Sequence, residues 1–296
     1  MRDANCKERY FILPIQWREI VEFGVNPEAV ESISDQMNDM GASAIEPKTD
    51  NSLLPSIDEI LTPTNPYRTL IKDVCLDILL YMTEKHRVSM LKTVANELNR
   101  VHSLFMKNFP NFKGTISIIG HSLGTLIVFD LLTMEPKDFD RYNIPRLQFF
   151  PNALFLLGSP ISMIRLLNGE VIRPMHCDAS EGIKRVRVKY LYNIYHMYDP
   201  IAHRLEPLIS RDFPKEPVPV IKPVYAKEGE ENKEIAQLNP LRKRIDYVIF
   251  GSYLESAYQY LSALSQHSNY WTNLEVTSFI AKELMAMRTH DDINEK

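Results

Sequence analysis

The segment Thr115–Thr133, TISIIGHSLGTLIVFDLLT, constrains the fold of this chain more than any other. Residues 115–119 have the short apolar pattern of a buried strand, and residues 126–133 behave as a helix. Between them, Gly120 and Gly124 flank Ser122 in the pattern Gly-x-Ser-x-Gly. Any side chain at either glycine is expected to collide with the neighbouring strand or helix. The segment therefore predicts a strand that turns sharply into a helix.

Strand and helix patterns alternate along the rest of the chain. Strands are predicted at residues 10–17, 153–157, 186–196 and 244–250, and helices at 70–82, 88–108, 256–264 and 276–287. Residues 25–64 and 204–240 are predicted to be irregular excursions, and residues 288–296 a charged tail. We expect one α/β domain over residues 1–296, built on a mostly parallel sheet with flanking helices.

Composition argues against several functional classes. The 296 residues carry a formal net charge of -4, whereas a general nucleic-acid binder has a basic surplus. The three cysteines, Cys6, Cys75 and Cys177, are widely separated and predict neither a disulfide framework nor a zinc knuckle. No secretory signal and no apolar run of about 20 residues is present, so a soluble or peripherally attached protein in a reducing compartment is expected.

Ser122 is the candidate nucleophile, because the predicted turn presents its hydroxyl and aims backbone N–H groups at a reacting carbonyl oxygen. The N–H of Leu123 is the candidate oxyanion donor. A serine needs a histidine to accept its proton. In α/β hydrolases the acid and the histidine follow the serine along the chain. Among the eight histidines, His267 has the best position for this role, because it follows the last predicted strand, at residues 244–250.

Two aspartates compete for the role of the orienting acid. Asp199 follows the strand predicted at residues 186–196, and active sites of parallel sheets collect at the carboxyl ends of strands. Asp246 lies inside the next strand, where a structural carboxylate paired with Arg242 or Arg244 is the alternative interpretation. Position favours Asp199 and leaves Asp246 as the second candidate.

Four sequence blocks together resemble the DDHD-domain family of intracellular phospholipases A1, which prefer phosphatidic acid and related glycerophospholipids. The blocks are GHSLGTLIVFDLL, LFLLGSPISMIRLLNGE, YNIYHMYDPIAHRLEPLI and RIDYVIFGSYLESAYQYLSALSQHSNYW. They occur in the order of the family, and the likeness extends from about Tyr10 to Leu284.

The resemblance implies a triad of Ser122, Asp199 and His267. The four residues that name the family fall at Asp199, Asp246, His267 and position 275, where this chain has Glu275 instead of aspartate. These four side chains could instead ligate a divalent metal, although the triad gives Asp199 and His267 a sufficient role without one. We expect no required cofactor.

Family members also carry a strand that ends in His-Gly-x-Gly, whose loop supplies a second oxyanion donor, and this motif does not occur in the sequence. The fold is therefore expected to lack the first strands.

The leading hypothesis is a serine ester hydrolase that acts on glycerophospholipids in the cytoplasm, peripheral to intracellular membranes. The alternatives are a catalytically silent lipid-binding or trafficking protein and a metal-binding module. Two basic segments, residues 184–189 and 241–244, are candidates for contact with anionic lipid, and residues 161–167 could line an acyl site.

Overall fold

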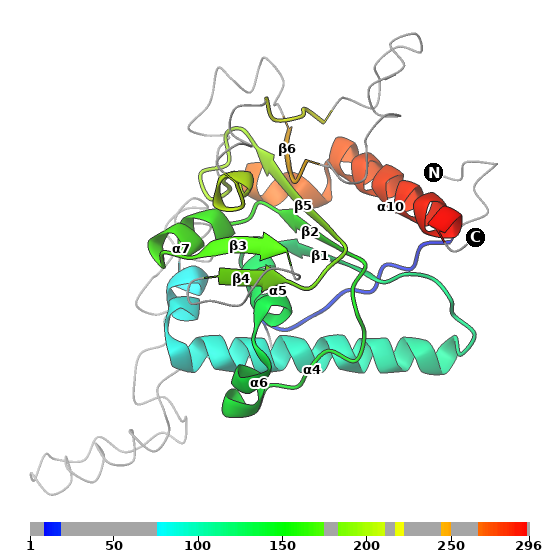
Figure 1. Cartoon of the computed structure of the whole chain (residues 1–296), viewed down its shortest axis with the longest axis horizontal. Coiled ribbons are helices and arrows are strands. Elements are labelled where there is room, and N and C mark those ends of the chain that lie inside the picture. Colours follow the sequence, from blue (N-terminus) through cyan, green and yellow to red (C-terminus); the bar gives the residue numbers. More distant parts are fainter. Residues whose placement is uncertain are drawn as a thin grey trace, which may run out of the picture.

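The computed structural model describes residues 9–18, 76–174, 183–210, 217–221, 244–249 and 266–294. Its centre is a four-stranded sheet in the order β1-β2-β5-β6, in which every neighbouring pair is parallel (Figure 1). The strands are β1 (Ser117–His121), β2 (Ala153–Leu157), β5 (Tyr190–His196) and β6 (Asp246–Ile249). This arrangement confirms the predicted α/β-hydrolase-like fold class, a mostly parallel sheet with flanking helices. Among the described residues, no strand precedes β1.

Helices cover both faces of this sheet, so the described part of the chain forms three layers (Figure 1). One face carries α4 (Glu84–Asn108) and α5 (Leu123–Thr133), and the other carries α10 (Leu274–Asn294). The shorter elements are α6 (Pro136–Tyr142), α7 (Ile161–Leu167), the strand pair β3 (Val171–Pro174) and β4 (Ile183–Val186), and the 3-10 turns η1 (Glu206–Leu208) and η5 (Asn269–Trp271).

Strand β2 shows why the sheet needs two covering layers. All five of its residues are buried. Leu154 and Leu156 join the core that contains α4 and α5, whereas Phe155 and Leu157 join the core that contains α10. Because side chains alternate between the faces of a strand, an apolar residue at every position requires cover on both sides. The run ALFLL therefore specifies a central strand.

Parallel pairing brings the carboxyl ends of three strands to one edge of the sheet. His121 at the end of β1 pairs with Leu157 at the end of β2, and Leu157 pairs with Ile194 of β5. Beyond these pairs, the N–H of Ser122 donates to the carbonyl oxygen of Leu157, and the N–H of Gly158 donates to that of Ile194. The chain thus leaves β1, β2 and β5 at neighbouring points of this carboxyl edge.

The strand predicted at residues 10–17 is wrong. These residues form no regular secondary structure and are mostly exposed. Their aromatic side chains pack on a helix surface instead, since the Phe11 ring lies 5.4 Å from that of Phe105 and 5.0 Å from that of Phe109. Pro14 lacks the N–H that a strand ladder uses, so the aromatic pattern reflects packing rather than pairing.

Other element boundaries differ from the prediction in smaller ways. The strand predicted at 186–196 is two strands, because β4 ends at Val186 and β5 begins at Tyr190. The first central strand covers 117–121 rather than 115–119. The charged tail continues α10 as helix to Asn294. The described residues do not include the predicted excursion 25–64, the predicted helix 256–264, or residues 211–216 and 222–240 of the predicted excursion 204–240. Within the part of the chain that is described, no helix has the length and apolar composition needed to cross a membrane.

Candidate active site

Ser122 occupies a strained turn between β1 and α5. Its φ of 50° and ψ of -126° are rare for a residue other than glycine and cost about 1–3 kcal/mol. The turn is held because the Ser122 N–H donates to Leu157 over 3.0 Å and the Thr125 hydroxyl donates to the Ser122 carbonyl over 2.6 Å. A Cβ at Gly120 would lie 3.0 Å from the Thr125 Cα, so the strand can approach the helix closely only with glycine there.

Gly124 does not share this constraint, and the sequence-based expectation for it is wrong. A Cβ built at Gly124 meets no heavy atom within 4 Å, apart from the local helix backbone. Its neighbour Leu123 is the first residue of α5, so the Leu123 N–H has no acceptor within the helix. The positive end of the helix dipole lies at the same point. The Leu123 N–H is therefore available to stabilise negative charge that develops beside Ser122.

His267 connects Ser122 to Asp199. Its Nε2 lies 2.8 Å from the Ser122 Oγ, and its Nδ1 lies 2.9 Å and 3.0 Å from the two carboxylate oxygens of Asp199. Only 1% of the His267 surface is exposed. An ionised carboxylate can only accept, so the proton of a neutral His267 is on Nδ1, and Nε2 is left to accept the proton of Ser122. The structure thus brings together the three residues predicted as a triad.

Hydrogen bonds keep Asp199 in the ionised form. Burial by itself raises the pKa of this carboxyl group, but hydrogen bonds from His267, Tyr270 and the N–H of Ile201 outweigh it and hold the pKa below its usual value. The Tyr270 hydroxyl donates to Oδ2 over 2.7 Å, and the N–H groups of Ile201 and Ala202 donate to Oδ1 over 2.8 Å and 3.3 Å. The carboxylate therefore has a fixed orientation and a negative charge to offer His267.

Tyr270 and Gly158 belong to the site but were not among the residues predicted from the sequence. The Tyr270 hydroxyl accepts the N–H of His196 over 2.8 Å while it donates to Asp199, so it ties β5 to the acid. Gly158 has a φ of +58°, and a Cβ there would lie 2.8 Å from the Tyr270 ring and 3.2 Å from Asp199 Oδ2. A glycine directly after the buried strand β2 was the available signal. The position of Tyr270 three residues after His267 was not informative by itself.

His121, the second residue of the glycine motif, supports the backbone of His267. Its Nε2 lies 2.6 Å from the His267 carbonyl oxygen, and the two ring centroids are 5.1 Å apart. A carbonyl oxygen only accepts, so Nε2 of His121 carries the hydrogen. Burial lowers the pKa of His121, which favours its neutral form. The motif therefore contributes a second contact that positions His267.

Asp246, the second candidate acid, lies in a different hydrogen-bond network. It is fully buried, and its Oδ1 accepts from Asn193 Nδ2 and the N–H of Leu205, each over 2.9 Å. Its Oδ2 accepts from Arg204 Nε over 3.3 Å and from the N–H of Glu206 over 3.2 Å. Among the hydrogen bonds of the described residues, none joins Asp246 to His267. Its surroundings match the structural interpretation, although Arg204 takes the place of the basic residues predicted as its partner.

Glu206 completes this second network. Its burial shows that the prediction of a surface excursion is wrong at this position. The segment that begins at residue 204 was predicted to be a surface excursion, yet Leu205 and Glu206 are fully buried. Arg244 donates to the two carboxylate oxygens of Glu206 over 2.8 Å and 2.6 Å, and the Ile245 N–H donates over 2.9 Å. Burial raises the pKa of Glu206, but these hydrogen bonds bring it below the usual value. The network fixes the chain after Asp199 against β6.

The structure does not gather the four residues that the sequence suggested as metal ligands. Glu275 lies in the first turn of α10, where its N–H donates to the Asn273 side chain over 2.9 Å. Asp246 is bonded to Arg204 and Asn193, away from the contact between Asp199 and His267. Across the described ranges, no three side chains of His, Cys, Asp or Glu are close enough together to hold a metal ion.

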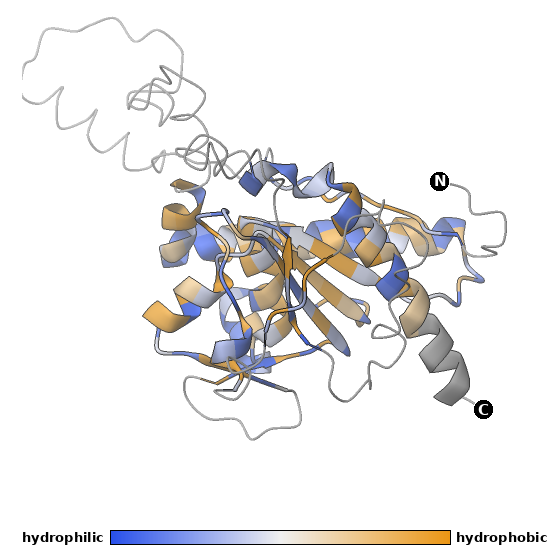
Figure 2. Cartoon of the chain, turned by 90° about the horizontal axis from the view of Figure 1, so that it is seen from above, coloured by the Kyte–Doolittle hydropathy of each residue, from blue (hydrophilic) through white to orange (hydrophobic). Residues whose placement is uncertain are grey.

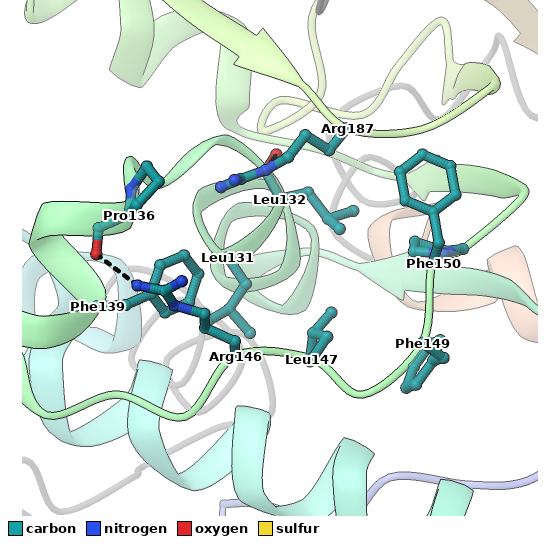
Figure 3. A pocket seen from close by; sticks show the side chains of 10 residues that line it. Leu131, Leu132, Pro136, Phe139, Arg146, Leu147, Phe149, Phe150 and Arg187 are labelled. Atoms are coloured by element: carbon teal, nitrogen blue, oxygen red, sulfur yellow. Dashed lines mark hydrogen bonds between the residues drawn. The ribbon is translucent and has the colours of Figure 1, made fainter.

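A small pocket lies at the opposite end of α5 from Ser122 (Figure 3). Its volume is about 160 Å³, and Leu131, Leu132, Phe139 and Arg187 contribute to its lining. Arg187 donates to the carbonyl oxygens of Leu132 and Met134 and so satisfies the end of α5. An 11-residue helix is about 16 Å long. The length of α5 therefore separates the pocket from Ser122.

Comparisons with known proteins found a matching family model and several similar proteins. The model of the DDHD domain matches residues 147–229 and 222–285. A probable mitochondrial phospholipase of Schizosaccharomyces pombe is 28% identical over 92% of this chain and 46% of its own length. A probable mitochondrial phospholipase of Saccharomyces cerevisiae is 26% identical over 99% of this chain and 43% of its own length. An intracellular phospholipase A1 of Caenorhabditis elegans is 24% identical over 70% of this chain and 26% of its own length.

This chain spans less than half the length of these relatives. No solved structure matches it. The matched ranges nevertheless include the four positions that the resemblance singled out, Asp199, Asp246, His267 and Glu275. The family match, the order of the motifs and the similarity to the two fungal proteins agree, and they support the assignment of residues 147–285 to the DDHD domain.

Proposed function

We propose that this protein is a serine ester hydrolase that releases a fatty acid from glycerophospholipids, with the specificity of a phospholipase A1. The observation that carries the proposal is the unbroken hydrogen-bond chain from Ser122 Oγ to His267 Nε2, and from His267 Nδ1 to Asp199. A nucleophile, a base and an orienting acid in this order are the requirements for acyl transfer from an ester.

The first half-reaction acylates Ser122. His267 Nε2 takes the hydroxyl proton while Oγ forms a bond to the ester carbonyl carbon, whose oxygen becomes negatively charged. The Leu123 N–H, at the positive end of α5, stabilises that oxyanion. Asp199 stabilises the imidazolium that has formed. Collapse of the intermediate breaks the bond to the glycerol oxygen, which takes the proton from His267 and leaves as lysophospholipid.

The second half-reaction returns Ser122 to its starting form. A water molecule gives a proton to His267 Nε2 and adds to the carbonyl carbon of the acyl-enzyme. The second tetrahedral intermediate expels Ser122 Oγ, which recovers its proton from His267, and the free fatty acid leaves. Tyr270 and His121 take no part in proton transfer. They hold Asp199 and the His267 backbone in position through both steps.

The names of the relatives support the substrate class. All three relatives above are named as phospholipases, and the nematode protein is named as a phospholipase A1. We extend both terms to this chain, and with them peripheral attachment to an intracellular membrane. The names of the fungal proteins add a mitochondrial location. Fractionation of cells that express this chain should therefore measure its amount separately in mitochondria, in other membranes and in the cytoplasm.

Activity and labelling measurements with a Ser122→Ala control test the proposal. A fluorophosphonate probe should label the wild type and not the variant, because only an activated serine reacts. Phospholipid vesicles labelled separately in the sn-1 and sn-2 chains should lose the sn-1 chain. Turnover should be unchanged by EDTA, since the mechanism uses no metal. Equal turnover of a short-chain ester by both proteins would contradict the enzymatic assignment and leave lipid binding without catalysis.

A further inference from the structure

The surface around the candidate nucleophile carries almost no charge. Three segments meet at the carboxyl edge beside Ser122, namely residues 158–168, 197–203 and 267–274. The Asp, Glu, Lys and Arg residues in them are Arg165 and Asp199 alone, and both are buried. Arg165 is paired with Asp130 and Glu170, and Asp199 is bonded to His267. These three segments therefore carry no exposed Asp, Glu, Lys or Arg, and the adjoining residues Arg204 and Glu275 are only partly exposed.

The same three segments expose large apolar side chains. On α7 these are Met163, Leu166 and Leu167, of which the two leucines are 69% and 72% exposed. Figure 2 shows the apolar colour of α7 at the outer edge of the molecule. Met197 follows β5 directly, and Trp271 and Leu274 follow His267, with exposed fractions of 47%, 54% and 54%. We call these six residues the apolar rim.

Each part of the apolar rim lies on a segment that also carries a residue of the candidate active site. The Trp271 ring lies 5.9 Å from that of His121, whose Nε2 bonds to the carbonyl oxygen of His267. Met197 lies two residues before Asp199. Helix α7 begins three residues after Gly158, which lies against Tyr270. The three segments thus hold Gly158, Asp199 and His267 together with the residues of the rim.

We infer that the apolar rim is the membrane-docking surface of this protein, which inserts at the bilayer interface and brings Ser122 to the acyl esters. The inference rests on the proposed function and gives that site its partner surface. Apolar side chains and an indole are suited to the interfacial region, and the three segments carry no exposed Asp, Glu, Lys or Arg that insertion would dehydrate. A protein partner on the same surface would block the path of the ester to Ser122.

The basic segment at residues 184–189 is a weaker candidate for lipid contact than the sequence indicated. Lys184 pairs with Glu170 at 3.1 Å, and Arg185 pairs with Glu135 at 2.7 Å. Arg187 donates to carbonyl oxygens at the end of α5. These charges already have partners within the chain. Docking through the apolar rim should therefore be insensitive to salt and should not require anionic lipid.

The experiment compares vesicle binding with turnover of a soluble ester. The Leu166→Asp and Leu167→Asp double variant should bind phosphatidylcholine vesicles at least about tenfold more weakly in flotation and lose vesicle hydrolysis to the same extent. Its turnover of a short-chain ester should match the wild type. Leu104→Asp on α4 is the matched control, since Leu104 is 52% exposed and should leave both measurements unchanged.

A second measurement is independent of the folding of the double variant. The sequence has two tryptophans, so Trp17→Phe leaves Trp271 as the sole indole. Brominated phosphatidylcholine vesicles should quench its fluorescence to the same extent at low and at high salt. Absence of quenching, retained vesicle binding by the folded double variant, or binding that requires phosphatidic acid and disappears at high salt would overturn the inference. Ser122→Ala should still dock and be quenched, so loss of catalysis alone would contradict only the proposed function.

Discussion

Asp199 and Asp246 are two buried aspartates of one domain that occupy contrasting hydrogen-bond networks. Each accepts several hydrogen bonds, and each is less than a tenth exposed. The network of Asp199 passes through an imidazole to the hydroxyl of Ser122 at the edge of the sheet. That of Asp246 ends on Asn193, Arg204 and backbone N–H groups. The role of a buried carboxylate is therefore indicated by whether its partners lead to a group that can react.

The two carboxyl groups also differ in the direction in which the fold moves their pKa. Burial raises the pKa of both, but the hydrogen bonds of Asp199 to His267 and Tyr270 bring its pKa below the usual value. For Asp246, burial dominates and is reinforced by the nearby charge of Glu206, so the pKa is raised in spite of hydrogen bonds from Asn193 and Leu205. An acid that orients a histidine needs its charge at neutral pH, and Asp199 meets that requirement more readily.

The largest effect that separates the two networks should come from Asp199→Asn. This change keeps the shape of the side chain but replaces an acceptor-only group with an amide, which cannot select the reactive tautomer of His267. We expect kcat for ester hydrolysis to fall by about 10⁴-fold. Fluorophosphonate labelling of Ser122 should slow by a similar factor. Steady-state kinetics and a labelling time course measure the two effects.

Asp246→Asn is the matched control for that comparison, because it makes the same chemical change in the second network. Its kcat should stay within about tenfold of the wild type, which corresponds to a barrier change of about 1.4 kcal/mol or less. Should Asp246→Asn abolish labelling while the protein remains folded and Asp199→Asn leaves labelling intact, the two aspartates would have to exchange roles.

The next largest effect should be the loss of stability in Asp246→Ala. Removal of this carboxylate leaves Arg204 and several buried N–H groups without their acceptor. We expect the free energy of unfolding to fall by about 3–5 kcal/mol, as is usual when one partner of a buried ion pair is removed. Urea denaturation followed by circular dichroism measures the change.

Asp140→Ala provides the exposed counterpart of that experiment. Asp140 pairs with Arg146 at 3.1 Å, but its side chain is 75% exposed, and such pairs contribute about 0–1 kcal/mol. If both alanine variants lose the same small amount of stability, the network around Asp246 does not support the fold as we describe it.

Local patterns predicted most of the central architecture. The run ALFLL predicted β2 with the observed bounds, and the apolar spacing before Asn108 and after Leu274 predicted α4 and α10 approximately. The aromatic segment at residues 10–17 misled the prediction, because propensity does not reveal whether a strand has a partner. In the part of the chain that the structure describes, this segment has no strand to pair with, and Phe11 packs on α4 instead.

The residues of the candidate site were predictable where chain order constrained them and not elsewhere. Ser122, Asp199 and His267 follow a motif and a fixed order, and the structure brings them within hydrogen-bond distance of one another. Glu206 lies in a charged, proline-rich segment whose composition predicts exposure, and only its contact with Arg244 accounts for its burial. Long-range ion pairs of this kind have no local sequence signal.

The smallest predicted effect is the dependence of stability on pH. The contributions of Asp199 and Asp246 to this dependence should have opposite signs. The pKa of Asp199 is lowered on folding, so its stabilisation is present above the unfolded pKa, near about 4, and is lost as the pH falls through the folded pKa. The pKa of Asp246 is raised, so protonation favours the folded state, and stability decreases as the pH rises from the unfolded pKa through the folded one.

Asparagine variants isolate these two contributions, because an amide does not titrate. Relative to Asp199→Asn, the wild type should lose stability on acidification, and relative to Asp246→Asn it should gain stability. A folded pKa that differs from the unfolded pKa by one pH unit corresponds to about 1.4 kcal/mol of unfolding free energy. Urea unfolding of the three proteins from neutral pH down to about pH 3, below the unfolded pKa of aspartate, tests this. Slopes of the same sign would remove the electrostatic distinction between the two networks.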